Sequence, residues 1–423
     1  MLRAFGPGLV TGASDDDPSG VATYSQAGAQ FGLGLLWVSL VTLPLMAAVQ
    51  EICDRTALAT GRSLGELAAA KYPARGRPVL TVLVGSLLIA NTLNIAADLV
   101  AIGSGMNLLH AGPTWLWALI AGVLISAMII VGSFNQIARI FKFLCLALLT
   151  YFGVLVAVRV DWRSVLHHTL VPQFSFSAGY VALLVAVLGT TISPYLFFWQ
   201  SAHRLEEMRD EPEGGDVPVP LRHLDENRAS RKQRNSRLDV FGGMLLSNLV
   251  MFAIIAASAS TLQGKTIQSA AQAAAALKPV AGPWASALFA LGFIGTGMLA
   301  VPVLAGSGAA GLAGLLGKRW GFSHAVKNAP VFYALVAVGT LGGTALSLVD
   351  NNPIQLLVAV AVINGIAAAP FLLLVMLISA DRTLMGGYHN GPVATTLGWV
   401  AFALMAGAAA ALIIQTVGPL LGS

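Results

Sequence analysis

The chain has 423 residues, of which 56% are hydrophobic and only 10% are charged. Soluble globular domains carry roughly 25% charged residues, so this composition excludes a soluble fold and indicates a polytopic membrane protein. The formal net charge of +5 is explained by basic residues in the loops on one side of a membrane. It therefore gives no reason to expect a nucleic-acid partner.

Eleven apolar runs are long enough, at roughly 20 residues, to cross a bilayer as helices. They predict one transmembrane domain over residues 1–423, with no separate soluble domain. The first run continues through a group of aspartates without a distinct cleavage region, so we expect it to remain in the protein and not to act as a signal peptide. The expected spans lie at about 6–33, 36–59, 78–109, 113–134, 141–159, 179–203, 239–262, 284–316, 329–349, 353–379 and 392–416.

The basic residues are distributed unequally between the two sides of these spans. With the N-terminus inside, 20 of the 24 Lys and Arg residues fall on the cytoplasmic side and 4 on the other. This distribution follows the positive-inside rule and predicts a multi-pass protein of the inner (plasma) membrane with a cytoplasmic N-terminus. The one long hydrophilic stretch, at about 204–237, is expected to be a cytoplasmic loop.

The first expected span contains three consecutive carboxylates, in the segment Asp15–Gly20. Pro18 lacks a backbone N–H and disfavours the helical conformation at Asp17, and the serine and glycine that follow propagate a helix poorly. Unpaired backbone and acidic side chains at membrane depth persist only inside the protein or beside a wet cavity. The segment therefore predicts a broken helix that forms a cation site.

The second and third spans also carry polar residues. Glu51 and Arg55 are i,i+4 on one helix face, which favours a buried ion pair that fixes helix packing. Asn91, Asn94 and Asp98 share one stripe of the third span and are expected to face the protein interior. Asp98 is either a proton or cation relay or an acid held by neighbouring amides, and the sequence leaves both interpretations open.

The sixth span is expected to break as the first does, because Pro194 follows a run of small hydroxyl residues that includes Thr190 and Ser193. Discontinuous helices at corresponding positions predict a transporter built from inverted repeats, with spans 1–5 matching spans 6–10 and an eleventh span added. The substrate would bind between the two breaks, opposite Asp17. Asn364 in the tenth span is expected to make a packing hydrogen bond.

Several motifs, spread over nearly the whole chain, resemble those of the NRAMP divalent-metal transporters. That resemblance implies a leucine-transporter-like fold, alternating access, and a metal ion held between the unwound parts of helices 1 and 6. The motifs are Gly6-Pro7-Gly8, Asp17-Pro18, Gln26-Ala27-Gly28-Ala29-Gln30-Phe31-Gly32, Ala97-Asp98-Leu99, Ile102-Gly103 and Asp381-Arg382-Thr383-Leu384-Met385-Gly386.

The chain also departs from the usual family pattern. Gly20 stands in place of an asparagine in helix 1. In helix 6, Ser193 and Tyr195 replace a methionine and a histidine, and Thr190 takes the place of an alanine whose carbonyl can reach the metal. Ala101 stands where the family has an acidic residue in helix 3.

These departures change the expected chemistry of the site. A thioether favours Mn²⁺, Fe²⁺ and other transition ions, whereas Mg²⁺ and Ca²⁺ prefer oxygen donors. The shorter residues at positions 20 and 193 predict a larger, all-oxygen site for a partly hydrated ion. We expect this ion to be Mg²⁺, with Mn²⁺ also transported. For Asp15 and Asp16 two roles are open: they hold water around the ion, or one of them caps a helix or pairs with another group. The predicted metal residues are Asp17, Thr190, Ser193 and Gly20, and those near the site or along the pathway are Asp16, Tyr195, Asp98 and Asn364.

Proton coupling is not expected. A tyrosine, whose ordinary pKa is about 10, carries protons poorly near neutral pH, so Tyr195 is a weak substitute for a histidine. With Ala101 in place of an acid, Asp98 is the one group of this relay that remains. We therefore expect divalent cation transport similar to that of the NRAMP-related magnesium transporters, with no cofactor, enzymatic activity or obligate protein partner.

Three alternatives accompany this interpretation. A proton-driven Mn²⁺/Fe²⁺ importer would keep the family and change the cargo. A symporter for an organic substrate would keep the fold, but three aspartates would repel a carboxylate substrate. An intramembrane aspartyl protease needs two aspartates that share a proton, and Asp17 with Asp98 is the candidate pair.

Overall fold

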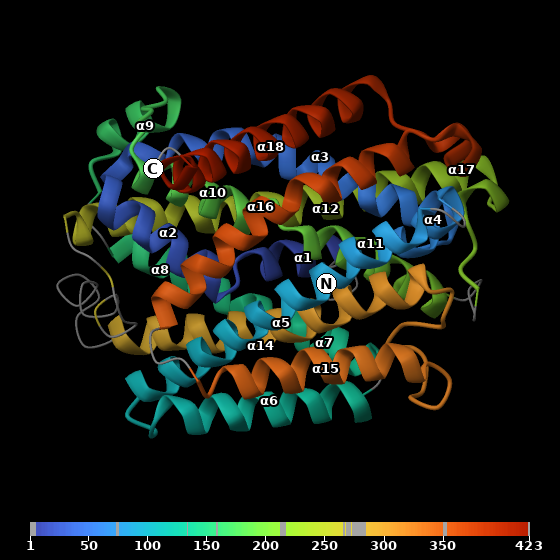
Figure 1. Ribbon diagram of the computed structural model, residues 1–423, viewed down its shortest axis with the longest axis horizontal. Coiled ribbons are helices and arrows are strands. Elements are labelled where there is room, and N and C mark those ends of the chain that lie inside the picture. Colours follow the sequence, from blue (N-terminus) through green and yellow to red (C-terminus); the bar gives the residue numbers. More distant parts are fainter. Residues whose placement is uncertain are drawn as a thin grey trace.

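The computed structural model describes residues 6–72, 76–132, 134–157, 160–211, 217–264, 267, 272, 285–349 and 353–421. Within these ranges the regular structure is helical and contains no strand. Figure 1 shows most helices running along one direction, with α9 (Trp162–Leu170) at one end of the bundle and α4 (Leu64–Lys71) and α17 (Arg382–Met385) at the other. The expected all-helical polytopic fold is confirmed.

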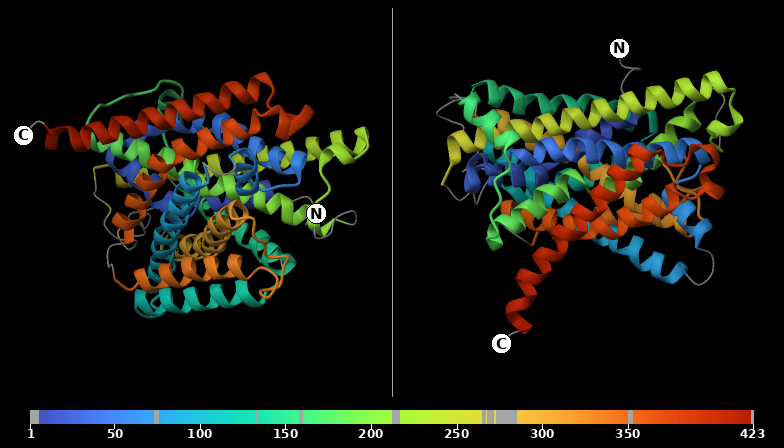
Figure 2. Two further views of the ribbon diagram at one scale, coloured as in Figure 1. Left: turned by 45° about the vertical axis from the view of Figure 1, so that its right-hand side comes forward. Right: turned by 90° about the horizontal axis from the view of Figure 1, so that it is seen from above.

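Eight helical segments of the described chain are long and apolar enough to cross a membrane. In both views of Figure 2 the C-terminal end of the last of them extends past the rest of the bundle. The segments are α3 (Trp37–Thr60), α5 (Arg77–Leu108), α6 (Thr114–Val131), α10 with α11 (Ala178–Thr191 and Pro194–Asp210), α12 (Glu226–Leu262), α14 (Ala285–Leu315), α16 (Pro353–Ser379) and α18 (Pro392–Leu421).

The other three expected spans take shorter or broken forms. The first consists of two helices, α1 (Pro7–Asp15) and α2 (Pro18–Phe31). The fifth is divided into α7 (Phe134–Leu144) and α8 (Leu149–Ala157) by the short 3-10 helix η3, and the ninth is α15 (Pro330–Leu346). The division into two repeats of five spans plus an eleventh stays a prediction.

The hydrophilic stretch expected as a loop at about 204–237 is largely helical. The helix α11 continues to Asp210, and α12 begins at Glu226, where the Asp225 side chain accepts a hydrogen bond from Arg228 N. This capping explains why α12 extends well beyond the apolar part of its sequence. The connection between the two halves of the chain is therefore shorter than its polarity indicates.

Glycines let the first broken helix lie directly against α12. A Cβ atom on Gly12 would lie 2.1 Å from the Gly243 carbonyl oxygen, and one on Gly243 would lie 1.9 Å from that of Gly8. Such distances leave no space for any side chain, so the two backbones touch. This contact fixes α1, which leads directly into the first helix break.

An ion pair joins the elements at the end of the bundle that contains α4 and α17. Lys71, the last residue of α4, donates a hydrogen bond to Asp381, which caps α17. This bond from Lys71 lowers the pKa of the Asp381 carboxyl below its ordinary value. Asp381 begins one of the motifs that resemble the NRAMP pattern, and here it joins the end of α4 to the beginning of α17.

We expect Gly243→Ala to destabilise the protein and Gly242→Ala to leave it unchanged. The added methyl group at position 243 meets backbone, and overpacking of this kind costs about 1–3 kcal/mol. A Cβ on Gly242, one residue earlier on the same helix, meets nothing within 4 Å. The midpoint of thermal unfolding in detergent measures both effects, and equal midpoints for the two variants would contradict the close packing of α1 on α12.

Candidate metal centre

The first helix break places Asp17 between α1 and α2. Asp16 and Asp17 leave the helical conformation, and Asp17 then caps α2, since its Oδ1 accepts hydrogen bonds from Gly20 N at 2.8 Å and Ser19 Oγ at 2.5 Å. Capping of this kind satisfies one carboxylate oxygen. Oδ2 has a single weak hydrogen bond among those of the described chain, with Tyr195 Oη at 3.5 Å, so this oxygen keeps lone pairs that could accept a cation.

The second break has the same form. The helix α10 ends at Thr191, Ile192 and Ser193 are not helical, and Pro194 begins α11. The Ser193 hydroxyl donates to the carbonyls of Gly189 and Thr190, at 2.5 and 3.0 Å. The last carbonyls of a helix lack helical N–H partners and carry partial negative charge. The C-terminal ends of α1 and α10 thus add oxygen donors that suit a cation.

Tyr195 joins the two breaks. It lies in the first turn of α11 and is 1% exposed, and its hydroxyl donates to the Ser14 carbonyl at 2.8 Å, just before the first break. Its 3.5 Å contact with Asp17 places the same hydroxyl beside the capping carboxylate. The two discontinuous helices therefore meet at one place inside the protein.

Thr190 and Ser193 lie on the facing break but bond to other groups. The Thr190 hydroxyl lies 2.9 Å from the Val187 carbonyl and 3.2 Å from Tyr24 Oη on α2. Neither hydroxyl bonds to Asp17 among the interactions of the described residues. Their oxygen lone pairs remain available to an ion, because both hydroxyl hydrogens are directed to carbonyl groups.

The three consecutive aspartates differ in their hydrogen bonding. Asp15 Oδ2 accepts a hydrogen bond from Ser247 Oγ on α12 at 2.6 Å, and both oxygens of Asp16 are buried without a bond partner in the described chain. Within the described residues, no group of three or more His, Cys, Asp and Glu side chains is placed to hold a metal ion. Asp17 is therefore the one of the three whose hydrogen bonding places it beside Tyr195, at the junction of the breaks.

The polar stripe of α5 is buried as predicted. Asn94 and Asn364 exchange hydrogen bonds in both directions at 3.2 Å, so Asn364 makes the packing contact that the sequence predicts. Asp98 is fully buried, and neither of its carboxylate oxygens has a bond partner within the described chain. It is thus not an acid held by neighbouring amides, which leaves the relay interpretation open.

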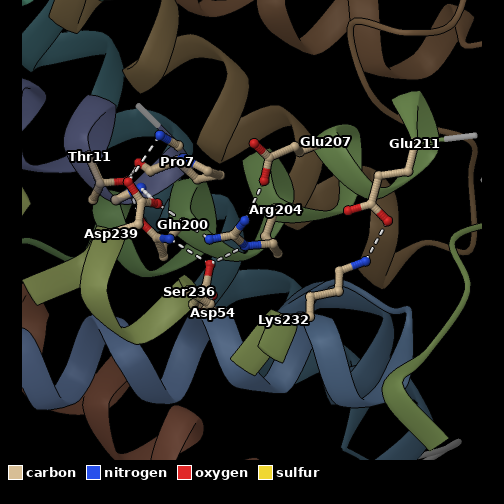
Figure 3. A network of polar contacts seen from close by, with 12 residues as sticks. Pro7, Thr11, Asp54, Gln200, Arg204, Glu207, Glu211, Lys232, Ser236 and Asp239 are labelled. Atoms are coloured by element: carbon tan, nitrogen blue, oxygen red, sulfur yellow. Dashed lines mark hydrogen bonds and ion pairs between the residues drawn. The ribbon is translucent and has the colours of Figure 1, made fainter. Parts of the chain in front are cut away.

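The sequence did not reveal a buried polar network that holds the beginning of α1 (Figure 3). Arg204 Nε donates to Asp54 Oδ1 at 2.8 Å, and the same oxygen accepts from Gln200 Nε2 at 2.6 Å. Gln200 is also hydrogen-bonded to Thr11 on α1. Asp239 on α12 accepts from the backbone N–H groups of Gly6 and Gly8, at 3.0 and 2.8 Å.

This network was missed because Arg204 falls at the end of an apolar span, where the sequence indicates a loop. Arg204 also lies 3.4 Å from Asp239, so one guanidinium connects α11 with α3 and α12. The acidic residues Asp54 and Asp239, close to or inside apolar spans, were the available signal. The neighbouring Glu51–Arg55 pair was found from its spacing and is confirmed at 3.0 Å.

The sequence matches a known family along most of its length. The family model for natural resistance-associated macrophage protein-like proteins matches residues 8–415. The divalent metal cation transporter MntH of Verminephrobacter eiseniae is 28% identical to this chain, covering 99% of it and 90% of that protein. The transporter of the same name from Deinococcus radiodurans is 26% identical, covering 95% of this chain and 87% of that protein.

Solved structures share the fold. A manganese transporter of Eremococcus coleocola, in complex with an aromatic bis-isothiourea substituted compound, matches with a TM-score of 0.76 at 15% identity, over 100% of this chain and 88% of that one. A nucleobase–cation symporter in a closed conformation matches with a TM-score of 0.54 at 15% identity, over 97% of this chain and 93% of that one. The expected leucine-transporter-like architecture is confirmed by these neighbours.

Proposed function

Because this chain belongs to the natural resistance-associated macrophage protein-like family and is a transporter of divalent metal cations, we propose that its cargo is Mn²⁺, bound by oxygen atoms between the two helix breaks. The observation that carries this proposal is the position of Asp17, whose Oδ2 faces Tyr195 where the discontinuous helices meet. The chain is a membrane transporter and not an enzyme, so the aspartyl protease hypothesis is set aside.

The donor atoms at the breaks fit Mn²⁺. Carboxylate, carbonyl and water oxygens suit Mg²⁺, Ca²⁺ and Mn²⁺, whereas softer transition ions favour sulfur and imidazole. The residues that meet here offer the Asp17 carboxylate, the hydroxyls of Thr190 and Ser193, and the carbonyls at two helix ends. Among these ions, Mn²⁺ has the support of the comparisons, which include transporters named for divalent metal cations and for manganese.

Mg²⁺, the cargo that the sequence favoured, is the second candidate. The observation in its favour is Ser193, because a hydroxyl at this position of helix 6 supplies no sulfur to select against a hard ion. The comparisons give no support for magnesium over manganese, so we place Mg²⁺ after Mn²⁺. Competition between the two ions for uptake separates the candidates.

We also propose an orientation and an energy source for transport. The excess of Lys and Arg on one side supports a cytoplasmic N-terminus in the plasma membrane. For uptake, the membrane potential contributes about 4.6 kcal/mol per 100 mV to a dication, twice the value for one charge. We propose that this suffices without a coupled proton, since Tyr195 donates its hydroxyl to the Ser14 carbonyl and no histidine stands at its position.

Asp17→Asn should abolish Mn²⁺ uptake while leaving the fold intact. Asparagine is as good a helix cap as aspartate, so α2 keeps its cap and loses only the charge. Loss of a group that hydrogen-bonds a metal ligand lowers metal affinity or activity roughly 10–100-fold. Loss of the ligand's own charge should lower uptake by proteoliposomes by more than this. Asp15→Asn is the matched control, because Asp15 bonds Ser247 on α12, and it should retain measurable uptake. Full activity of Asp17→Asn would refute the assignment.

Ser193→Met should raise the preference for Mn²⁺ over Mg²⁺, because it adds a soft donor to an oxygen site. The ratio of the two uptake rates in proteoliposomes measures this change, and Ser193→Ala controls for loss of the hydroxyl. The variant is best made alone, because a Cβ at Gly20 would lie 3.2 Å from the Asp15 carbonyl oxygen and asparagine there would strain the break. An unchanged ratio in Ser193→Met would show that position 193 does not face the ion.

Uptake should proceed without metal-dependent acidification of the liposome interior. A pH-sensitive dye enclosed in proteoliposomes reports proton entry while Mn²⁺ is followed separately. We expect a negative-inside potential to accelerate Mn²⁺ entry and the dye signal to remain constant. If acidification accompanies Mn²⁺ and disappears in Asp98→Asn, the transporter is proton-coupled and Asp98 is the coupling group.

A further inference from the structure

A cavity lies between α3, α12 and the beginning of α18, and it shares no residue with the metal centre. Its volume is about 790 Å³. The walls combine apolar residues of the three helices with the charged side chains of Glu51, Arg55 and Arg237. None of the residues proposed to bind or move the metal ion lines this cavity.

We propose that an anionic phospholipid binds in this cavity, with its phosphate beside Arg237 and an acyl chain along α3. This site is independent of the proposed cargo. Three features support it: the depth of the cavity in the membrane, its charge, and the apolar face that continues from it.

The depth of the cavity is that of lipid headgroups. The sequence of α12 is strongly basic from Arg228 to Arg237 and becomes apolar from Val240 onward. The cavity wall includes Arg237 and Phe241, which stand on the two sides of this change, and also Pro392, the first residue of α18. The change from basic to apolar residues marks where α12 enters the hydrocarbon of the membrane. The cavity therefore lies at the boundary between hydrocarbon and headgroups.

The charge of the cavity favours an anion. Arg55 is 4% exposed and is held by Glu51, the Tyr388 carbonyl and the Asn390 side chain, so it neutralises Glu51 and fixes the wall. Arg237 also bonds Glu51 through Nε at 3.2 Å, yet its side chain is 57% exposed. Two arginines against one glutamate leave one positive charge. A guanidinium on the wall of a cavity suits a phosphate, which it binds in a two-bond geometry.

The apolar part of the site continues along one face of α3. Leu40, Pro44 and Ala47 repeat at helical spacing toward the membrane interior, and Leu40 is 52% exposed. Ala47 lines the cavity, and its small side chain leaves open the space that a larger one would fill. Across the cavity, Phe241 and Val393 are 50% and 69% exposed. An acyl chain would cover these surfaces, which a free phosphate compound would leave uncovered.

The test compares lipid binding to the purified full-length protein in detergent, measured by native mass spectrometry. Phosphatidylglycerol and phosphatidylcholine with identical acyl chains serve as the anionic and zwitterionic probes. We expect phosphatidylglycerol to bind more tightly, and Arg237→Gln to weaken its binding about fivefold, the effect of one arginine near an anionic lipid surface. Phosphatidylcholine binding should change little.

Arg228→Gln is the matched control. Arg228 lies on the same helix, its side chain is 56% exposed and it contacts Asp225 at 3.2 Å, but it does not line the cavity. We expect this variant to bind phosphatidylglycerol as the unmodified protein does. Equal weakening in both variants would overturn the proposal, because it would indicate general attraction to a basic helix. An Arg237→Gln variant that keeps the full preference would overturn it as well.

A second variant tests the cavity itself. Ala47→Leu keeps every charge and fills part of the space, so it should weaken phosphatidylglycerol binding while thermal unfolding stays unchanged. Inorganic phosphate, added up to millimolar concentration, should not displace the lipid. Displacement by phosphate, or unaltered binding in Ala47→Leu, would show that no acyl chain occupies the cavity.

Discussion

The arrangement of the protein depends on two interrupted helices that must satisfy their exposed backbone groups inside a membrane. An unsatisfied backbone group in hydrocarbon costs several kcal/mol, so each interruption persists only where other groups complete it. Asp17 caps the helix after the first break, and Ser193 bonds the carbonyls before the second. Tyr195 then connects the second break to the first. We propose that Asp17 Oδ2 binds the transported ion, together with the lone pairs that these hydrogen bonds leave on the carbonyls at the helix ends.

The sequence predicted the breaks because their cause is local. Proline acts on its own position and on the residue before it, so Asp17 and Ser193 could be located from the chain alone. The Glu51–Arg55 pair was equally accessible, since an i,i+4 spacing places both side chains on one helix face. The burial of Asp98 followed from the stripe that it shares with two asparagines. Each of these features depends on residues a few positions apart.

The remaining features depend on contacts between distant segments. Asp15 bonds Ser247 instead of joining Asp17 in one carboxylate cluster, and nothing near either residue in sequence indicates this pairing. Arg204 connects α11 with two other helices and secures the beginning of α1 through Asp239, although its position beside a hydrophilic stretch indicated a loop. Such partners are fixed by how helices pack, as in the glycine contact between α1 and α12. The polar stretch is largely helical although its composition predicts a loop, because a capped helix outside the bilayer needs no apolar residues.

We propose that one carboxylate, Asp17, holds Mn²⁺ where the two breaks meet. Crystals grown with Mn²⁺ and measured at a wavelength where manganese scatters anomalously locate the ion directly. We expect an anomalous peak in contact with Asp17 Oδ2, near the carbonyls at the ends of α1 and α10, and expect it to disappear in Asp17→Asn. A peak beside Asp16 or Asp98, or one that persists in the variant, would refute the role of Asp17 as the metal ligand.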